Sequence, residues 1–149
     1  MDSLRGIGRD GVLPWRVPED LSRFRQLTQG HIVVVGRTTF DKLPQLDGRT
    51  VAVVSKKFSA GDRLPKNAFG FKTFQEVHAH FRNDRGLLYV AGGAMLYQTT
   101  VQFWARLYLT EIVGSYECDT IMPVWEHRKH KLTSNRAFAA GRFKTYLFM

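Results

Sequence analysis

Short apolar runs, rather than alternating apolar and polar positions, mark the candidate strands of this chain. The segments HIVVVG (31–36), RTVAVVS (49–55) and GLLYVAGG (86–93) are rich in aliphatic residues and are bounded by glycine or polar residues. Runs of this kind are typical of strands that are covered on both faces of a sheet. The segment ARLYLTEIV (105–113) predicts a further strand, and FGFKTF (69–74) predicts a short one.

Helical patterns lie between these strands. In VPEDLSRFRQLTQG (17–30), Pro18 falls in the first turn, Phe24 and Leu27 lie on one apolar face, and Gly30 follows the last turn. These are the residue preferences of helix ends and of an amphipathic helix. Shorter helices are predicted over residues 37–43, 94–101 and 73–81, the last with the capping-box pair Thr73 and Glu76.

The order of these elements predicts the fold class. Strands alternate with helices over residues 18–110, and HKLTSNRAF (130–138) and RFKTYLFM (142–149) then read as a closing antiparallel pair. We therefore expect an α/β protein with a single domain over residues 1–149. Its architecture would be a three-layer sandwich: a mostly parallel central sheet with helices on both faces and an antiparallel C-terminal edge. In such sheets, ligands bind at the carboxyl ends of the strands.

The composition of the chain limits the cellular compartment and the classes of partner that we expect. The single cysteine, Cys118, cannot form an internal disulfide, which favours a reducing, cytoplasmic compartment. We find no signal-peptide pattern and no apolar run long enough to span a membrane, so no membrane partner is expected. The net charge of +9 indicates either attraction to anions or simply a basic, solvated surface. Because the basic residues are dispersed, we expect no nucleic-acid partner, and the histidines lack the spacing of a metal site.

Two of the predicted strands end in glycine and run into a predicted helix, at GRTT (36–39) and GGAM (92–95). Such turns expose backbone N–H groups to an anion, and two of them could hold one pyrophosphate. Each turn taken alone is more often only a tight connection. The segment SKK (55–57) closes a third strand; it would suit a further phosphate, or it is a basic turn on the surface.

Asp20 is a carboxylate on an apolar stripe. It lies four residues before Phe24 and seven before Leu27, whereas its neighbour Glu19 falls on the polar face of the same helix. One interpretation is a negative charge that complements the N-terminus of the helix. The other is recognition of a cationic or donor-rich ligand in a cleft. The residue pattern leaves both open.

Five ordered blocks closely resemble the motifs of the dihydrofolate reductase family: GIGRDGVLPWRVPEDL, GRTTF, LDGRTVAVVS, YVAGGAMLY, and LYLTEI followed by DTIMP. The resemblance runs from about residue 2 to residue 123. It implies NADPH as the cofactor, hydride transfer to the pterin ring of the small-molecule substrate dihydrofolate, and possible antifolate inhibitors. The alternatives are a catalytically weak pterin- or nucleotide-binding relative, and a structural protein that reuses the fold.

The resemblance also implies roles for individual residues. Asp20 would be the active-site carboxylate, Trp15 would hold an ordered water, and Thr110 would bond to the carboxylate or to its water. The implied substrate contacts are Leu21, Phe24, Leu43, Leu46 and Arg49, the last as a clamp for the α-carboxylate. The implied cofactor contacts are Ile7, Leu13, Gly36, Arg37, Thr38, Thr39, Ser55, Lys56, Gly92, Gly93, Ala94, Met95 and Tyr97. Among these, Arg37, Ser55 and Lys56 would flank the 2′-phosphate, and the Gly92–Gly93 peptide would be cis.

The opening segment GIGRDGVLPW (6–15) resembles the family's mobile lid, and Asp119 matches an acid whose loop contacts that lid. In the family, an apolar strand in the middle of the sheet precedes the lid. We therefore expect the gene product to begin about five to ten residues earlier, with such a strand, and then to be a monomer. Without that strand the chain should be unstable, unless another segment or a second chain fills its place.

Overall fold

The computed structural model describes all 149 residues of the chain and divides them into two compact units. The middle unit comprises Leu21–Leu96, and the terminal unit comprises Met1–Asp20 together with Tyr97–Met149. Two helices, α1 (Pro18–Thr28) and α4 (Ala94–Thr100), continue from one unit into the other. None of the helices combines the length and the apolar character needed to cross a membrane.

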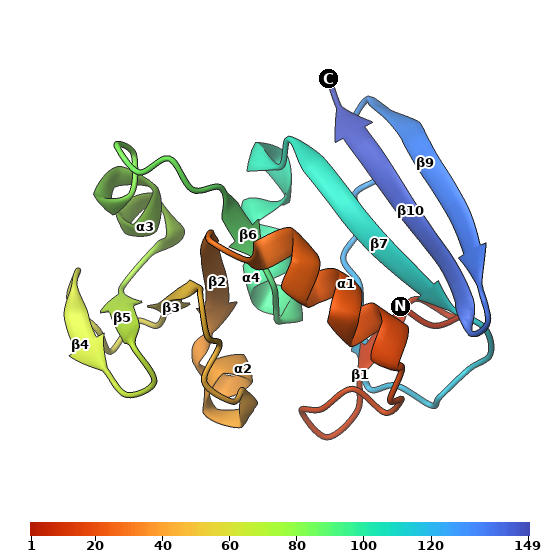
Figure 1. Ribbon diagram of the computed structural model, residues 1–149, viewed down its shortest axis with the longest axis horizontal. Coiled ribbons are helices and arrows are strands. Elements are labelled where there is room, and N and C mark those ends of the chain that lie inside the picture. Colours follow the sequence, from red (N-terminus) through yellow and green to blue (C-terminus); the bar gives the residue numbers. More distant parts are fainter. The chain divides into compact units, whose positions relative to one another are not determined.

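The middle unit is built on a five-stranded sheet in the order β4-β5-β3-β2-β6 (Figure 1). β5, β3, β2 and β6 run parallel to their neighbours, and only β4 is antiparallel, to β5. The mostly parallel sheet and its apolar strands are therefore confirmed. β4 was not predicted, because it has a polar sequence without an apolar run. The strands are β2 (Ile32–Gly36), β3 (Thr50–Val54), β4 (Asp62–Leu64), β5 (Ala68–Phe71) and β6 (Leu88–Val90).

Helices cover both faces of this sheet. On one face, Val34 shares an apolar cluster with Val77 of α3 and Leu96 of α4. On the other face, Val33 shares a cluster with Phe40 of α2. Because neighbouring residues of a strand point to opposite faces, burial on both sides explains the continuous apolar runs in the sequence. The two short helices are α2 (Arg37–Lys42) and α3 (Phe74–His80).

The ends of α1 and α3 agree with the sequence signals. Gly30 follows α1 with φ of +78°, and its N–H donates to the Gly48 carbonyl at 2.8 Å. At the start of α3, Thr73 Oγ1 accepts the Glu76 N–H at 3.2 Å. The Glu76 carboxylate accepts the Lys72 N–H at 2.8 Å, one residue before the partner that a standard capping box uses. The bond to Thr73 satisfies a first-turn N–H group that α3 itself leaves unpaired, and the other two bonds hold the residues that flank the helices.

The terminal unit contains two antiparallel sheets. β10 (Gly141–Phe148) lies between β7 (Arg106–Ile112) and β9 (His130–Phe138), which confirms the predicted closing pair. β7 is an end strand of this sheet, and β6 is an end strand of the parallel sheet. A second, two-stranded sheet pairs β1 (Gly6–Gly8) with β8 (Thr120–Ile121). These two strands were not predicted, because both are very short and β1 is rich in glycine.

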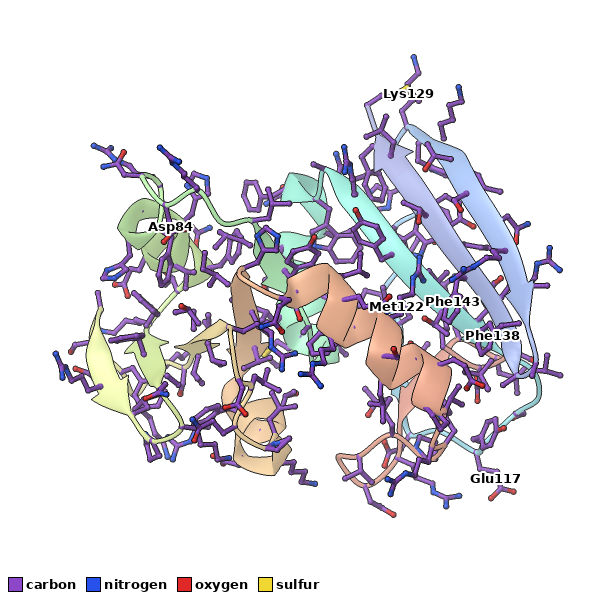
Figure 2. All side chains as sticks on the ribbon, in the orientation of Figure 1. Asp84, Glu117, Met122, Lys129, Phe138 and Phe143 are labelled. Carbon is purple, nitrogen blue, oxygen red and sulfur yellow. The ribbon has the colours of Figure 1, made fainter.

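Aromatic side chains form much of the packing in the terminal unit. The Trp125 ring lies 4.6 Å from the Tyr146 ring and 6.1 Å from the Phe148 ring, measured between centroids. Phe138 and Phe143 stack at 4.1 Å with an interplanar angle of 6°, next to the turn that joins β9 and β10 (Figure 2). The stack closes the end of the hairpin, so β9 and β10 stay paired up to their turn.

Asp2 is a buried carboxylate that holds two segments of the terminal unit together. It is 4% exposed, and its carboxylate accepts the N–H groups of Leu4 at 2.9 Å, Gly6 at 2.7 Å and Tyr116 at 3.0 Å. Burial acts to raise the pKa of Asp2, but these backbone N–H groups outweigh it and hold the pKa below its ordinary value. The charged carboxylate therefore anchors residues 2–6 to the loop around Tyr116.

Replacing this anchor gives a test of the fold. Asp2→Asn should lower the free energy of unfolding at neutral pH by roughly 1–3 kcal/mol, because an amide cannot accept all three N–H groups. Asp47→Asn, at an exposed carboxylate, removes the same charge and should change stability by less than about 0.5 kcal/mol. Urea unfolding of both variants and of the wild type measures the difference. An Asp2→Asn variant as stable as the wild type would contradict the anchor.

The same experiment has an expected pH dependence. Because the pKa of Asp2 is lower in the folded than in the unfolded chain, its stabilisation is complete above about pH 4. It is lost as the pH falls through the folded pKa. The stability gap between the wild type and Asp2→Asn should therefore narrow in acid.

Candidate active site

The two glycine turns predicted from the sequence lie side by side at the carboxyl ends of β2 and β6. The Gly36 N–H donates to the Gly92 carbonyl at 2.9 Å, and the Ala91 N–H donates to the Val34 carbonyl at the same distance. Gly92 has φ of +117°, and the Gly92–Gly93 peptide is cis, as the family resemblance implies. The expectation that both turns meet at one edge of the sheet is confirmed.

Both turns leave polar groups open to a ligand. A Cβ on Gly93 would lie 3.6 Å from Thr39 Oγ1, so the second turn closely approaches α2, the helix that follows the first turn. Thr38 is exposed, Ala94 is half-buried, and Met95 is 79% exposed. Backbone N–H groups and threonine hydroxyls in such a place can bind phosphate oxygens. The geometry therefore fits the pyrophosphate of a dinucleotide.

The predicted 2′-phosphate residues lie on two segments that touch each other. The Ser55 carbonyl accepts the Phe58 N–H at 3.1 Å, which closes a tight turn that exposes Lys56. Arg37, at the start of α2, donates from Nε to Asp41 Oδ1 at 3.2 Å. Its guanidinium lies 5.3 Å from the centroid of the Phe58 ring. The structure thus brings Arg37 next to the basic turn, as a site for one phosphate group requires.

Most of the predicted substrate contacts in the middle unit surround one apolar cluster. Phe24, Leu43 and Leu46 pack against the cluster that contains Val33. Leu21 is 54% exposed and available to a ligand. The sequence therefore placed these residues together correctly, while their contact with a substrate stays a prediction.

Arg49 is held by two hydrogen bonds that leave part of its guanidinium available. Its Nη1 donates to Thr28 Oγ1 at 3.3 Å, and its Nε donates to the Asp47 carbonyl at 3.1 Å. Thr28 is buried and donates in turn to the Phe24 carbonyl at 2.7 Å. A guanidinium has five N–H donors, so a pair of them remains for a carboxylate.

In the terminal unit, Asp20 is a half-buried carboxylate whose side chain accepts no hydrogen bond from another residue. Burial raises the pKa of Tyr97 to about 12, and the negative charge of Asp20 adds to this shift. The α-amino group of Met1 donates to the Thr110 carbonyl at 2.8 Å. Burial lowers the pKa of that amino group, while Asp20 acts in the opposite direction. The electrostatic effect of Asp20 thus reaches both Tyr97 and the Met1 amino group that is bonded to Thr110. The predicted bond between Asp20 and Thr110 stays a prediction.

Trp15 carries a buried donor that lacks a partner. Its indole Nε1 has no hydrogen bond within the protein, and its ring meets the Tyr116 ring edge-on at 5.3 Å between centroids. A buried N–H without a partner is costly, and most such groups in proteins bind water or a ligand. The orphaned donor fits the ordered water that the family resemblance implies for this residue.

The predicted contact between the opening segment and the Asp119 loop is confirmed. Asp119 Oδ2 accepts the Asp10 N–H at 2.9 Å, and the Asp119 N–H donates to the Gly8 carbonyl at 3.0 Å. The Asp10 N–H is the main reason that the pKa of Asp119 lies below its ordinary value. Ile7 lies within β1, and Leu13 is 50% exposed.

Phe58 is a residue of the site region that the sequence analysis missed. In the sequence it is an aromatic residue after a basic turn, with no periodic pattern around it. The one available signal in the sequence was Gly70, a glycine inside a predicted strand. In the structure, a Cβ at this position would lie 2.7 Å from the Phe58 ring. A glycine inside a strand often marks a close approach of another group.

The chain is an α/β protein whose middle unit carries the paired glycine turns and the basic turn, and whose terminal unit carries the half-buried carboxylate. Residues 1–149 match the family model described as Dihydrofolate reductase. The chain belongs to the dihydrofolate reductase family.

Individual relatives agree with this assignment. The dihydrofolate reductase of Mycobacterium leprae is 40% identical over 110 residues, which are 71% of this chain and 64% of that protein. Dihydrofolate reductase HdrB of Haloferax volcanii is 35% identical over 149 residues, 95% of this chain and 77% of that protein. The chain thus spans less than two thirds of the M. leprae relative and about three quarters of HdrB.

A solved structure shows the same architecture. Dihydrofolate reductase from Enterococcus faecalis, complexed with NADP(H) and RAB-propyl, superposes with a TM-score of 0.88 at 25% sequence identity. The similarity covers 99% of this chain and 92% of that one.

The orphaned indole of Trp15 leads to a testable expectation. Trp15→Phe should lower kcat/KM for dihydrofolate by up to about tenfold, because the site loses one hydrogen-bond donor. NADPH affinity should stay unchanged. Trp104→Phe is the control, since Trp104 Nε1 is already bonded to Thr100 Oγ1 at 3.0 Å; it should lower stability without changing the KM for dihydrofolate. Steady-state kinetics and thermal melts separate these effects, and an unchanged kcat/KM in Trp15→Phe would contradict the assigned role.

Proposed function

We propose that this chain catalyses the NADPH-dependent reduction of dihydrofolate to tetrahydrofolate. The observation that carries the proposal is Asp20, a half-buried carboxylate without a hydrogen-bond donor from the protein. In a chain that matches the family over its whole length, such a group is suited to bind the donor groups of a pterin. NADPH supplies the hydride when it is bound, and a proton from solvent completes the reduction of the ring C=N bond.

Asp20 has two roles in this proposal. Its carboxylate accepts hydrogen bonds from the amino group and the ring N–H of the pterin, which fixes the orientation of the substrate. Its negative charge also stabilises the protonated pterin, the form that accepts a hydride most readily. The partly buried position strengthens both effects, because the surrounding dielectric is lower than in water.

The middle unit would hold the charged ends of the two ligands. The side-by-side glycine turns at Gly36 and Gly92 support binding of the cofactor pyrophosphate through backbone N–H groups. Arg37 and the turn at Ser55 and Lys56 support binding of the 2′-phosphate. Arg49, with free N–H groups beside its bonds to Thr28 and Asp47, supports binding of the substrate's α-carboxylate.

We also propose that the enzyme acts in the cytoplasm, that it is a monomer when the apolar strand expected before the lid is present, and that antifolates bind in the dihydrofolate site. The single thiol of Cys118 supports a reducing compartment. Fractionation, sedimentation and competition between an antifolate and dihydrofolate would test these three points separately.

Loss of NADPH absorbance in the presence of dihydrofolate tests the reaction. We expect turnover that requires both compounds and yields tetrahydrofolate. A folded protein that binds NADPH but gives no turnover would favour a pterin- or nucleotide-binding relative instead.

Asp20→Asn tests the proposed role of the carboxylate. Turnover near neutral pH should fall by roughly a hundredfold or more, because asparagine keeps the shape but removes the charge that favours a protonated pterin. NADPH affinity should change little. Glu19→Gln is the matched control, since Glu19 is an exposed acid in the same helical turn. If Asp20→Asn turns over as fast as Glu19→Gln, Asp20 is only a charge at the end of a helix.

A further inference from the structure

Phe58 is built rigidly into the end of the basic turn. Its N–H donates to the Ser55 carbonyl at 3.1 Å, and the Lys57 N–H donates to Ser55 Oγ at 3.4 Å. These bonds fix the backbone on both sides of Lys56. The position of the Phe58 side chain is therefore tied to that of the turn itself.

The ring is fixed as well. Phe58 is half-buried and packs against the apolar cluster that contains Val33 and Val53. A Cβ on Gly70 would lie 2.7 Å from Phe58 Cγ, so the ring occupies the space that a side chain on β5 would need. A side chain packed between a cluster and a strand has few rotamers available.

The Phe58 ring also contacts the side chain of Arg37. The Arg37 guanidinium lies 5.3 Å from the centroid of the Phe58 ring, and its Nε donates to Asp41 Oδ1 at 3.2 Å. The Arg37 side chain is still 49% exposed. Its two terminal NH2 groups have no hydrogen-bond partner in the protein. The guanidinium is therefore held at Nε and over an aromatic ring, and it offers its outer N–H groups to a ligand.

We propose that Phe58 is a positioning residue that sets the preference for a 2′-phosphorylated cofactor by fixing Arg37. This inference rests on the proposed function, since it assumes that Arg37 binds the 2′-phosphate of NADPH. An exposed arginine loses rotamer freedom when it binds a phosphate, and an arginine already held by a ring loses less. This smaller entropy loss raises the affinity only for a ligand that carries the phosphate. The 2′-phosphate is the one chemical difference between NADPH and NADH.

The role of Phe58 differs from a general contribution to cofactor binding. A ring that stacked on the adenine would stabilise NADPH and NADH alike. A ring that acts through Arg37 changes only the ratio of the two affinities. The ratio of dissociation constants therefore reports on the proposal more directly than activity does.

The test compares dissociation constants of NADPH and NADH, measured by fluorescence titration, for the wild type, Phe58→Leu, Phe58→Tyr and Arg37→Ala. Phe58→Leu should weaken NADPH binding by about two- to fivefold and leave NADH binding unchanged, the range expected for a cation–π contact. Phe58→Tyr keeps the aromatic face and should retain the wild-type ratio. In the Arg37→Ala background, Phe58→Leu should have no further effect on NADPH affinity.

Phe81→Leu is the matched control for lost packing. Phe81 is a half-buried phenylalanine that packs against the cluster on the opposite face of the same sheet. This variant should lower stability, as measured by thermal melts, but leave the ratio of NADPH to NADH affinity unchanged.

The outcomes separate this proposal from the proposed function. A wild type that binds NADPH and NADH equally would overturn the assignment of the 2′-phosphate site itself. A wild type that prefers NADPH, with the same preference in Phe58→Leu, would overturn only the role of Phe58. Equal weakening of NADPH and NADH by Phe58→Leu, or an undiminished effect in the Arg37→Ala background, would also overturn it.

Discussion

The shared register of three parallel strands is the constraint on which the rest of the middle unit depends. β2 pairs with β3 on one side, from Ile32 opposite Thr50 to Gly36 opposite Val54, and with β6 on the other. This register brings the Gly36 N–H to the Gly92 carbonyl. A slip of one residue would turn the alternating valines to the wrong faces and separate the two glycines. The packing that stabilises the sheet therefore also brings together the two glycine turns that we propose bind the cofactor pyrophosphate.

Charge is distributed according to the ligands that each unit would bind. The middle unit presents cations and backbone N–H groups, which suit the phosphates and carboxylates of NADPH and dihydrofolate. The terminal unit presents Asp20, a negative charge that receives no hydrogen bond from the protein. A pterin is the part of the substrate that is rich in donors and that gains a proton during reduction. A chain with a net charge of +9 thus has a negative side chain at the position that we propose binds the pterin.

The sequence predicted the elements whose stability comes from burial on both faces. β2 and β3 were visible as apolar runs, and α1 was visible from Pro18 and Gly30. The short pairs β1–β8 and β4–β5 were not fully visible, because their pairing depends on residues far away in the sequence or on polar strands. The opening segment looked like a glycine-rich loop, so nothing indicated that Asp2 would be buried with three backbone donors.

Some site residues could be predicted from the residue pattern, some only from the family resemblance, and one only from the structure. The glycine turns follow from strand ends that run into helices, and Asp20 follows from its place on an apolar stripe. The roles of Arg49 and Trp15 needed the resemblance to a family, because neither residue stands out by spacing. Phe58 was found only in the structure, since its contact with Arg37 joins two segments that are separated by twenty residues of chain.

The central claim is that this chain passes a hydride from NADPH to the pterin ring of dihydrofolate. The most direct measurement uses NADPH that carries deuterium at the transferred position of its nicotinamide ring, with mass spectrometry of the folate product. The account predicts tetrahydrofolate with a single deuterium per molecule, formed as fast as NADPH is consumed. Tetrahydrofolate without deuterium, or NADPH consumption without tetrahydrofolate, would contradict it.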